Sequence, residues 1–151
     1  MAETAIPGVT HPILENDYAS EWMGIEVLAL SDGHATVRMT LRQEMLNGFG
    51  MAHGGMIFAF ADTAFALACN PVSPADPDSI TVAAGVDINF LKPAYQGQVI
   101  TAVADRRSSA GRSGLYDIQI FAANPGTEPS SGKPGELIAE FRGRSRTIPK
   151  K

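Results

Sequence analysis

The sequence predicts a single α+β domain in which a curved antiparallel sheet of about six strands wraps one long helix. Residues 54–69 are almost all apolar or small, which is typical of a helix hidden from water on every side. Segments before and after this run alternate apolar and polar residues, as half-buried strands do. The wrap leaves one side of the helix open, so we expect a homodimer.

The N-terminal part is expected to contain a flexible tail over residues 1–12, followed by the domain over residues 13–151. The tail contains proline and glycine and has no regular pattern. Residues 13–23 carry apolar side chains at helical spacing, which predicts a short amphipathic helix. Gly24 follows as its C-cap.

Two strands are expected before the long helix and four after it. The first two join at Asp32-Gly33, a dipeptide typical of hairpin turns. Alternate residues from Val82 to Phe90 are expected on one face of the third strand. Residues 124–135 are rich in turn formers and predict a mobile loop. The expected strands cover residues 25–30, 34–41, 81–91, 99–106, 115–123 and 137–148.

Composition excludes several classes of protein. A net charge of -4 and a pI near 5.3 argue against a nucleic-acid-binding protein. The single cysteine, Cys69, fits a reducing compartment, and the N-terminus has no secretory signal. The longest apolar run is interrupted by Asp62 and is shorter than the roughly 20 residues that a membrane span needs. We therefore expect a cytoplasmic protein that binds neither nucleic acid nor membranes.

The start of the long helix and the acid within it predict acyl chemistry. Gly54 and Gly55 leave backbone N–H groups open to a carbonyl oxygen that gains negative charge under attack. Asn47 can donate to that carbonyl or hold the attacking water, and His53 can orient a neighbour or donate to a leaving thiolate. Asp62 is the predicted general base or nucleophile, with a pKa raised by apolar neighbours.

The spacing of Gly54 and Asp62 carries a prediction about assembly. Eight residues on one helix span about 12 Å along its axis. Both groups therefore cannot reach one thioester carbonyl from the same helix. If both act on one substrate, one subunit supplies the carboxylate and another the helix start, so the sites lie at a dimer interface.

Structural interpretations of these residues stay open. Asp62 could bond to backbone or to a basic residue, and the two glycines could form only a tight turn. His53 could be a helix cap, and Asn47 before Gly48 a turn. For Thr63 we favour a hydrogen bond to its own helix. The histidines show no metal-ligand spacing, so no metal site is expected.

Residues 46–70, L-N-G-F-G-M-A-H-G-G-M-I-F-A-F-A-D-T-A-F-A-L-A-C-N, resemble the signature of the hotdog-fold acyl-CoA thioesterases of the phenylacetate-degradation (PaaI) type. The similarity continues in V-D-I-N-F-L-K-P-A (86–94), G-R-S-G-L-Y-D (111–117) and A-E-F-R-G-R-S-R (139–146), and covers roughly residues 15 to 148. It implies a hotdog fold, dimers that commonly pair into homotetramers, and hydrolysis of acyl-CoA without a metal or cofactor.

The resemblance also implies roles for single residues. Asp62 matches the family's catalytic acid, and Gly54 the backbone donor to the carbonyl. Asn47 and His53 match its polar partners, whereas Thr63 belongs to the motif with a less defined role. The implied substrate- and CoA-binding positions are Gly55, Asn89, Phe90, Lys92, Pro93, Arg112, Ser113 and Arg144.

Two positions depart from the family pattern. Some relatives carry a serine or threonine near Gly85 to orient the water, and Gly85 offers no hydroxyl. Phe49 stands where a polar residue is common, and it could shape the acyl pocket or only pack the loop.

Three functions follow from the resemblance. The first is a thioesterase on aryl-CoA, such as phenylacetyl- or hydroxyphenylacetyl-CoA, or on medium acyl-CoA. The second is a hotdog dehydratase or hydratase on hydroxyacyl thioesters, and the third is a non-catalytic acyl-CoA-binding protein. The intact set Asn47, His53, Gly54 and Asp62 favours the first, and release of free CoA separates it from the others.

Overall fold

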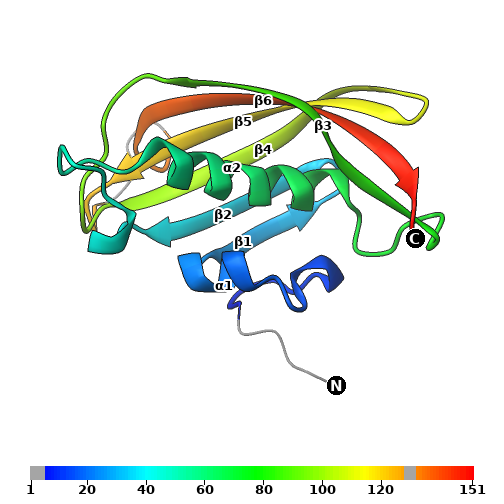
Figure 1. Ribbon diagram of the computed structural model, residues 1–151, viewed down its shortest axis with the longest axis horizontal. Helices are drawn as coiled ribbons and strands as arrows, with labels where there is room; N and C mark the ends of the chain where they lie inside the picture. The colour runs from blue at the N-terminus through cyan, green and yellow to red at the C-terminus, as the bar shows by residue number, and fades with distance from the viewer. Residues whose placement is uncertain (1–5, 128–131) are drawn as a thin grey trace.

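The computed structural model describes residues 6–127 and 132–151. They form a six-stranded antiparallel sheet, in the order β1-β2-β4-β5-β6-β3, that curves around helix α2 (Figure 1). This confirms the predicted arrangement of one long helix and a wrapped sheet. The elements are η1 (Pro12–Leu14), α1 (Tyr18–Met23), β1 (Glu26–Ser31), β2 (His34–Thr40), η2 (Gln43–Met45), α2 (Gly54–Cys69), β3 (Ser79–Phe90), β4 (Val99–Ala110), β5 (Ser113–Ala123) and β6 (Glu136–Pro149).

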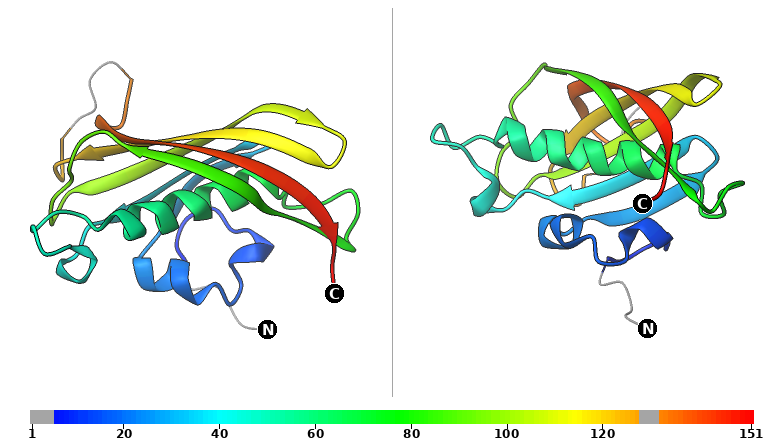
Figure 2. Two further views of the ribbon diagram at one scale, coloured as in Figure 1. Left: turned by 45° about the horizontal axis from the view of Figure 1, so that its top comes forward. Right: turned by 45° about the vertical axis from the view of Figure 1, so that its right-hand side comes forward.

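Helix α2 lies against the concave face of the sheet (Figure 2), and Ile57, Phe60, Phe65 and Leu67 are its large buried side chains. Phe60 and Phe65 are at most 1% exposed, and the Phe65 ring packs edge-on against Phe141 of β6. Strand β6 comes closest to the helix at Gly143, where a Cβ would lie 2.6 Å from Phe65 Cε2. A glycine at this position therefore sets how near the helix and the sheet can lie.

One stripe of α2 stays uncovered in the single chain. Gly55, Phe58, Asp62 and Ala66 follow one another at helical spacing, and each is at least partly exposed. Apart from Asp62 this stripe is apolar or small. The predicted complete burial of α2 is therefore not reached within one protomer, because the sheet wraps only the opposite side of the helix.

The two edges of the sheet differ. At the β1 edge, Val27 exchanges backbone hydrogen bonds with Pro7 and Val9, which closes that edge. At the other edge, β3 pairs only with β6 within the described part of the chain. A long edge strand with free backbone groups is a site for pairing with another chain.

The N-terminal region differs from prediction. The helix expected over residues 13–23 is divided into η1 and a shorter α1, because Asn16 has a φ of 61° and Asp17 caps a new helix. Gly24 ends α1 in the left-handed conformation, as predicted. Within the stretch expected as a loose tail, Ile6 and His11 are about 5% exposed or less, whereas residues 7–10 are exposed. Residues 1–5 lie outside the described residues.

Strand β3 does not keep a single face. A bulge between Ala83 and Gly85 shifts the register, so Val82 lies opposite Arg146 whereas Ile88 lies opposite Phe141. The prediction that Val82 shares the inner face of this strand was therefore wrong. The loop predicted over residues 124–135 lies partly outside the described residues.

Candidate active site

The start of α2 presents an unpaired backbone donor. His53 is the N-cap, and its Nδ1 accepts the Gly55 N–H at 3.0 Å. The Gly54 N–H has no hydrogen-bond partner among the described residues. Because Nδ1 of His53 accepts, the neutral ring carries its proton on Nε2, at an exposed position. The cap thus fixes the imidazole and leaves Gly54 open to a ligand.

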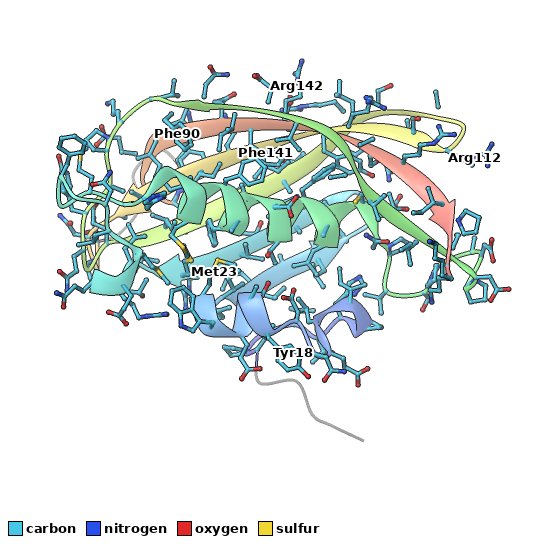
Figure 3. The ribbon with its side chains drawn as sticks, viewed as in Figure 1. Tyr18, Met23, Phe90, Arg112, Phe141 and Arg142 are labelled. Atoms are coloured by element: carbon cyan, nitrogen blue, oxygen red, sulfur yellow. The ribbon has the colours of Figure 1, made fainter. Side chains whose placement is uncertain are left out.

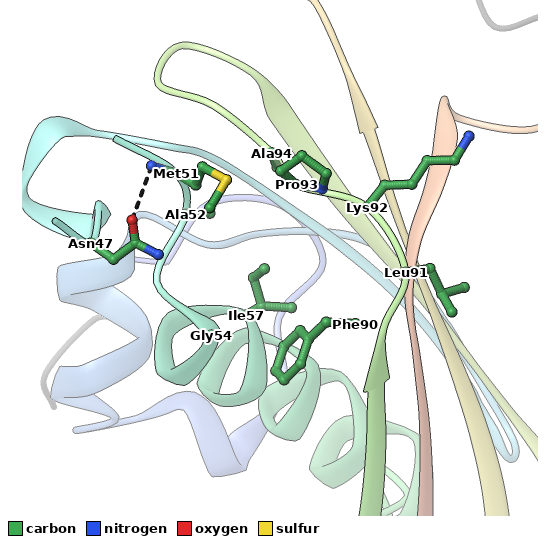
Figure 4. Close-up of a pocket in the computed structure, with 10 residues that line it drawn as sticks. All are labelled: Asn47, Met51, Ala52, Gly54, Ile57, Phe90, Leu91, Lys92, Pro93 and Ala94. Carbon is green, nitrogen blue, oxygen red and sulfur yellow. Dashed lines mark hydrogen bonds between the residues drawn. The ribbon is translucent and has the colours of Figure 1, made fainter. Parts of the chain in front are cut away.

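Asn47 holds the loop that leads to the helix. Its Oδ1 accepts the N–H groups of Phe49 at 2.9 Å and Met51 at 3.2 Å. Two donors on one atom identify that atom as the amide oxygen, so the NH2 group lies on the other side (Figure 4). That NH2 group has no partner in the described part of the chain. Phe49 stands at the tip of this loop and is 86% exposed.

A pocket of about 400 Å³ joins Asn47 to the helix start (Figure 4). Gly54 lies on its wall, and a Cβ at this residue would be 3.2 Å from Cζ of Phe90. Ile57, Leu91 and Pro93 make much of the remaining lining apolar. Two amide donors thus face a pocket with apolar walls, which is the pattern of a ligand site.

Asp62 lies two turns along α2, on the uncovered stripe rather than in the pocket. The half-buried carboxyl forms no hydrogen bond with any described residue. Burial raises its pKa above the ordinary value, and the negative charge of Asp17 raises it further. The neighbouring Thr63 hydroxyl bonds to Ser20 Oγ and to the Ala59 carbonyl, in line with the structural interpretation of Thr63.

The structure brings together only some of the residues expected to bind CoA. Phe90, Lys92 and Pro93 line the pocket, and Gly55 lies beside it at the helix start. The Lys92 side chain points away from Asn47 (Figure 4), and its ammonium pairs with Glu136.

Other expected residues lie elsewhere. Arg112 is in the β4–β5 turn, at the opposite end of the protomer from Phe90 (Figure 3), and Ser113 begins β5 directly after it. Asn89 and Arg144 lie on the outer face of the sheet, where Arg144 is opposite Gly85 and donates to the Ala84 carbonyl. Gly85 therefore faces away from α2, so a hydroxyl at that position would not point toward the helix.

Comparison with known proteins identifies the family. The Thioesterase superfamily profile matches residues 49–128. The acyl-coenzyme A thioesterase PaaI of Escherichia coli strain K12 is 38% identical over 91% of this chain and 88% of its own length. The solved structure of E. coli PaaI has a TM-score of 0.78 at 35% identity and covers 92% of this chain and 90% of that one. The chain belongs to the PaaI-type thioesterases.

A second solved structure agrees. A mutant of the phenylacetic acid degradation protein PaaI from Thermus thermophilus has a TM-score of 0.72 at 30% identity. It covers 86% of this chain and 98% of that one. The predicted hotdog fold and thioester hydrolase class are thereby confirmed.

In this PaaI-type thioesterase a single protomer does not bring all the predicted catalytic residues together. Gly54 and Asn47 meet in the pocket, whereas Asp62 projects from another part of the same rigid helix. Sequence reasoning missed the lining residues Met51 and Ile57 and the contact of Ser20 with Thr63. Apolar periodicity marks Ile57 only as a core residue, and nothing local in the sequence pairs Ser20 with Thr63.

The remaining observations concern metal ligands, membrane-spanning helices and the cysteine. No group of three His, Cys, Asp or Glu side chains within residues 6–127 and 132–151 is placed to hold a metal ion. None of the helices in those residues is long and apolar enough to cross a membrane. Burial raises the pKa of the Cys69 thiol to about 12, which keeps it protonated and unreactive at neutral pH.

Proposed function

We propose that this thioesterase hydrolyses acyl-CoA thioesters to a free acid and CoA, and that it prefers aryl groups, such as phenylacetyl or hydroxyphenylacetyl, or medium acyl chains. The observation that carries the proposal is the unpaired Gly54 N–H, which faces a pocket shared with the Asn47 amide. The names of the E. coli and T. thermophilus relatives support this choice of substrate class.

The thioester carbonyl would lie at the start of α2. Its oxygen accepts the Gly54 N–H, and the Asn47 amide donates a second hydrogen bond or holds the attacking water. Both donors are fixed beforehand, one by the helix and one by the loop hydrogen bonds of Asn47, so little reorganisation is needed as negative charge develops. The positive end of the helix dipole favours the same charge.

Asp62 would act on the carbonyl carbon, as the nucleophile or as the base that removes a proton from water. In direct attack a carboxylate oxygen bonds to the carbonyl carbon, the C–S bond breaks, and CoA leaves as a thiolate that takes a proton. Water then cleaves the acyl-Asp62 anhydride. A carboxyl with a raised pKa is a stronger base when ionised, which suits either route.

One substrate would meet Asp62 of one protomer and Gly54 of the other, because the two residues are too far apart on a single helix. The uncovered stripe of α2 and the open β3 edge are the two surfaces that a partner would cover, and they support a homodimer with two shared sites. We further propose that dimers pair into a tetramer. Arg112, Ser113 and Arg144, which lie far from the pocket of their own chain, would meet the CoA phosphates of another.

The pocket lining supports an aryl or compact acyl group. Phe90 lies directly over Gly54, and its exposed ring offers a flat face to an aromatic acyl group. A volume of about 400 Å³ accommodates such a group together with part of the pantetheine arm. No group beyond the chain, the thioester and water is needed for the proposed reaction.

Thiol release from a panel of aryl-, medium- and long-chain acyl-CoAs tests the proposal, with wild type beside Asp62→Ala and Asp62→Asn. We expect aryl or medium acyl-CoAs to be hydrolysed, and both variants to lose about a hundredfold or more in kcat. Binding of CoA esters without thiol release from any of them would contradict it. Equal rates for wild type and both variants would contradict the role of Asp62.

A further inference from the structure

Helix α1 is joined to the side of α2 by a chain of hydrogen bonds. Asp17, the N-cap of α1, accepts the Ser20 N–H on Oδ1 at 3.1 Å and the Ser20 hydroxyl on Oδ2 at 2.8 Å. The Ser20 Oγ lies 2.9 Å from Thr63 Oγ1 on α2. We call Asp17, Ser20 and Thr63 the α1–α2 chain.

The direction of the α1–α2 chain follows from counting protons. An ionised Asp17 can only accept, so the single proton of the Ser20 hydroxyl is directed to Asp17. Thr63 must then supply the proton between the two hydroxyls, which it shares with the more distant Ala59 carbonyl at 3.4 Å. Ser20 is 1% exposed, so the hydroxyl at the middle of the chain is shielded from water. The two bonds that Asp17 accepts therefore set the direction of the whole chain.

The chain ends next to Asp62. Thr63 is the following residue on a rigid helix, so α1 fixes the turn of α2 from which the Asp62 side chain projects. Asp62 itself has no hydrogen bond among the described residues, so its position depends on its helix. Asp17 is also the one charged group that acts on the Asp62 carboxyl beside the effect of burial.

Unlike Asp17, the other titratable groups around α2 do not hold a charge close to Asp62. Cys69 on α2 and Tyr116 on β5 are buried, and burial raises the pKa of each, so both are neutral at physiological pH. His11 packs at the far end of α2 against the Asn70 carbonyl. Glu21 of α1 is exposed, and no strand contributes a buried charge within the described residues. Asp17 thus stands out as the charge held near Asp62.

We propose that Asp17, Ser20 and Thr63 are positioning residues for thioester hydrolysis, which seat the turn of α2 that bears Asp62 and keep one negative charge at a fixed place beside its carboxyl. The inference rests on the proposed function of Asp62. Helix α1 is then part of the catalytic apparatus as well as part of the fold.

The test compares pH profiles of kcat/KM for wild type and Asp17→Asn. Asparagine is also a good N-cap, so α1 is retained while the charge is lost. We expect the acid limb of the profile to move to lower pH by roughly half a pH unit, because Asp62 ionises more easily without its charged neighbour. Glu21→Gln, which removes a charge from the exposed side of the same helix, is the matched control and should leave the profile unchanged.

Two further variants separate the positioning of the α2 turn from the effect of the Asp17 charge. Ser20→Ala and Thr63→Val break the chain but keep Asp17, so we expect kcat to fall several-fold with the acid limb close to that of wild type. Unchanged kcat in both variants would show that Ser20 and Thr63 do not position the turn of α2 that bears Asp62. If the acid limb of Asp17→Asn coincides with that of wild type, the negative charge of Asp17 does not affect the ionisation of Asp62, and this part of the proposal is overturned.

A substrate-free measurement keeps this inference distinct from the proposed function. Titration of the Asp62 side-chain carboxyl by carbon-13 NMR should give a lower midpoint in Asp17→Asn than in wild type and in Glu21→Gln. Equal midpoints in all three proteins would overturn the inference even if acyl-CoA is hydrolysed. A lowered midpoint without thiol release from any acyl-CoA would instead count against the proposed function.

Discussion

At the scale of single residues, Gly54 combines two roles that no other residue type can fill as well. Its N–H is unpaired at the start of α2, and the absent Cβ leaves room for Phe90 on the pocket wall. His53 caps the helix through Gly55, so the cap does not consume the Gly54 donor. Helix capping uses the Gly55 N–H, and the neighbouring Gly54 N–H is left for the proposed contact with the thioester carbonyl.

Gly54→Pro tests the backbone donor at a position where proline fits the fold. Proline is tolerated at the first helical residue, and His53 already has the extended conformation that precedes proline well. The variant loses the N–H, so we expect kcat to fall roughly a hundredfold or more while the melting temperature stays near that of wild type. Steady-state thiol release and thermal unfolding provide the two measurements.

Two controls accompany Gly54→Pro. Gly54→Ala keeps the N–H and only brings a methyl group near Phe90, so its loss should be smaller. Gly48→Ala lies in the same loop region with nothing within 4 Å of the new Cβ, and should behave as wild type. A Gly54→Pro enzyme with normal kcat would show that this N–H does not polarise the carbonyl.

At the scale of elements, the fold depends on how closely α2 sits in the curved sheet. Strand β6 approaches the helix at Gly143, and the Phe65 ring occupies the space that a side chain there would need. Because one side of α2 packs against the sheet, the opposite stripe, with Phe58, Asp62 and Ala66, is free for a partner. The sheet thus determines which side of the helix is exposed, and Asp62 lies on that side.

Gly143→Ala should destabilise the protein by about 1–3 kcal/mol, because the new methyl group overlaps the Phe65 ring in a packed core. Denaturant unfolding measures the change. Gly85→Ala on the neighbouring strand β3 is the control, since its nearest neighbour would be the flexible Arg144 side chain at an ordinary 3.5 Å. Equal stability of the two variants would contradict the close packing at Gly143.

Much of this element structure is predictable from the sequence, for identifiable reasons. The apolar run gives α2 its bounds, and Asp32-Gly33 marks the first hairpin, because both signals are local. The split of the N-terminal helix was missed although its causes, the positive φ of Asn16 and the Asp17 cap, are local. The bulge after Ala83 was missed because it depends on pairing with β6. Register between strands is likewise a tertiary property.

The candidate site was predictable to a different extent. Asn47, His53 and Gly54 are close in sequence, so their grouping around the helix start follows from the loop. Arg112 and Arg144 were assigned to the site by resemblance, yet they lie far from the pocket of the same chain. Sequence identifies residue types well, but it does not say which copy of the chain supplies them.

At the scale of the whole molecule, the proposed catalytic role of Asp62 has a cost in stability at neutral pH. The folded state holds this carboxyl half-buried without a hydrogen bond, and its pKa is raised relative to the unfolded chain. The protonated form is therefore favoured by folding. The stability linked to this proton is fully present below the unfolded pKa and is lost as pH rises through the folded pKa.

Asp62→Asn should therefore raise the melting temperature at neutral pH while abolishing activity. The gain should shrink as pH falls through the raised pKa of Asp62, because the wild-type carboxyl is then neutral as well. Thermal unfolding of both proteins between neutral and acidic pH measures this difference. A wild type that is more stable than the variant at neutral pH would contradict the unpaired, desolvated state of Asp62.

The most direct test of the account is complementation between two inactive variants. Gly54→Pro and Asp62→Asn are unfolded together in equal amounts and refolded, so that mixed dimers form. If each site combines Gly54 of one protomer with Asp62 of its partner, half of the sites in mixed dimers are intact, and the mixture should recover about a quarter of wild-type thiol release by random pairing. Activity that stays at the level of the separate variants would show that both groups act within one chain, and would contradict the shared site.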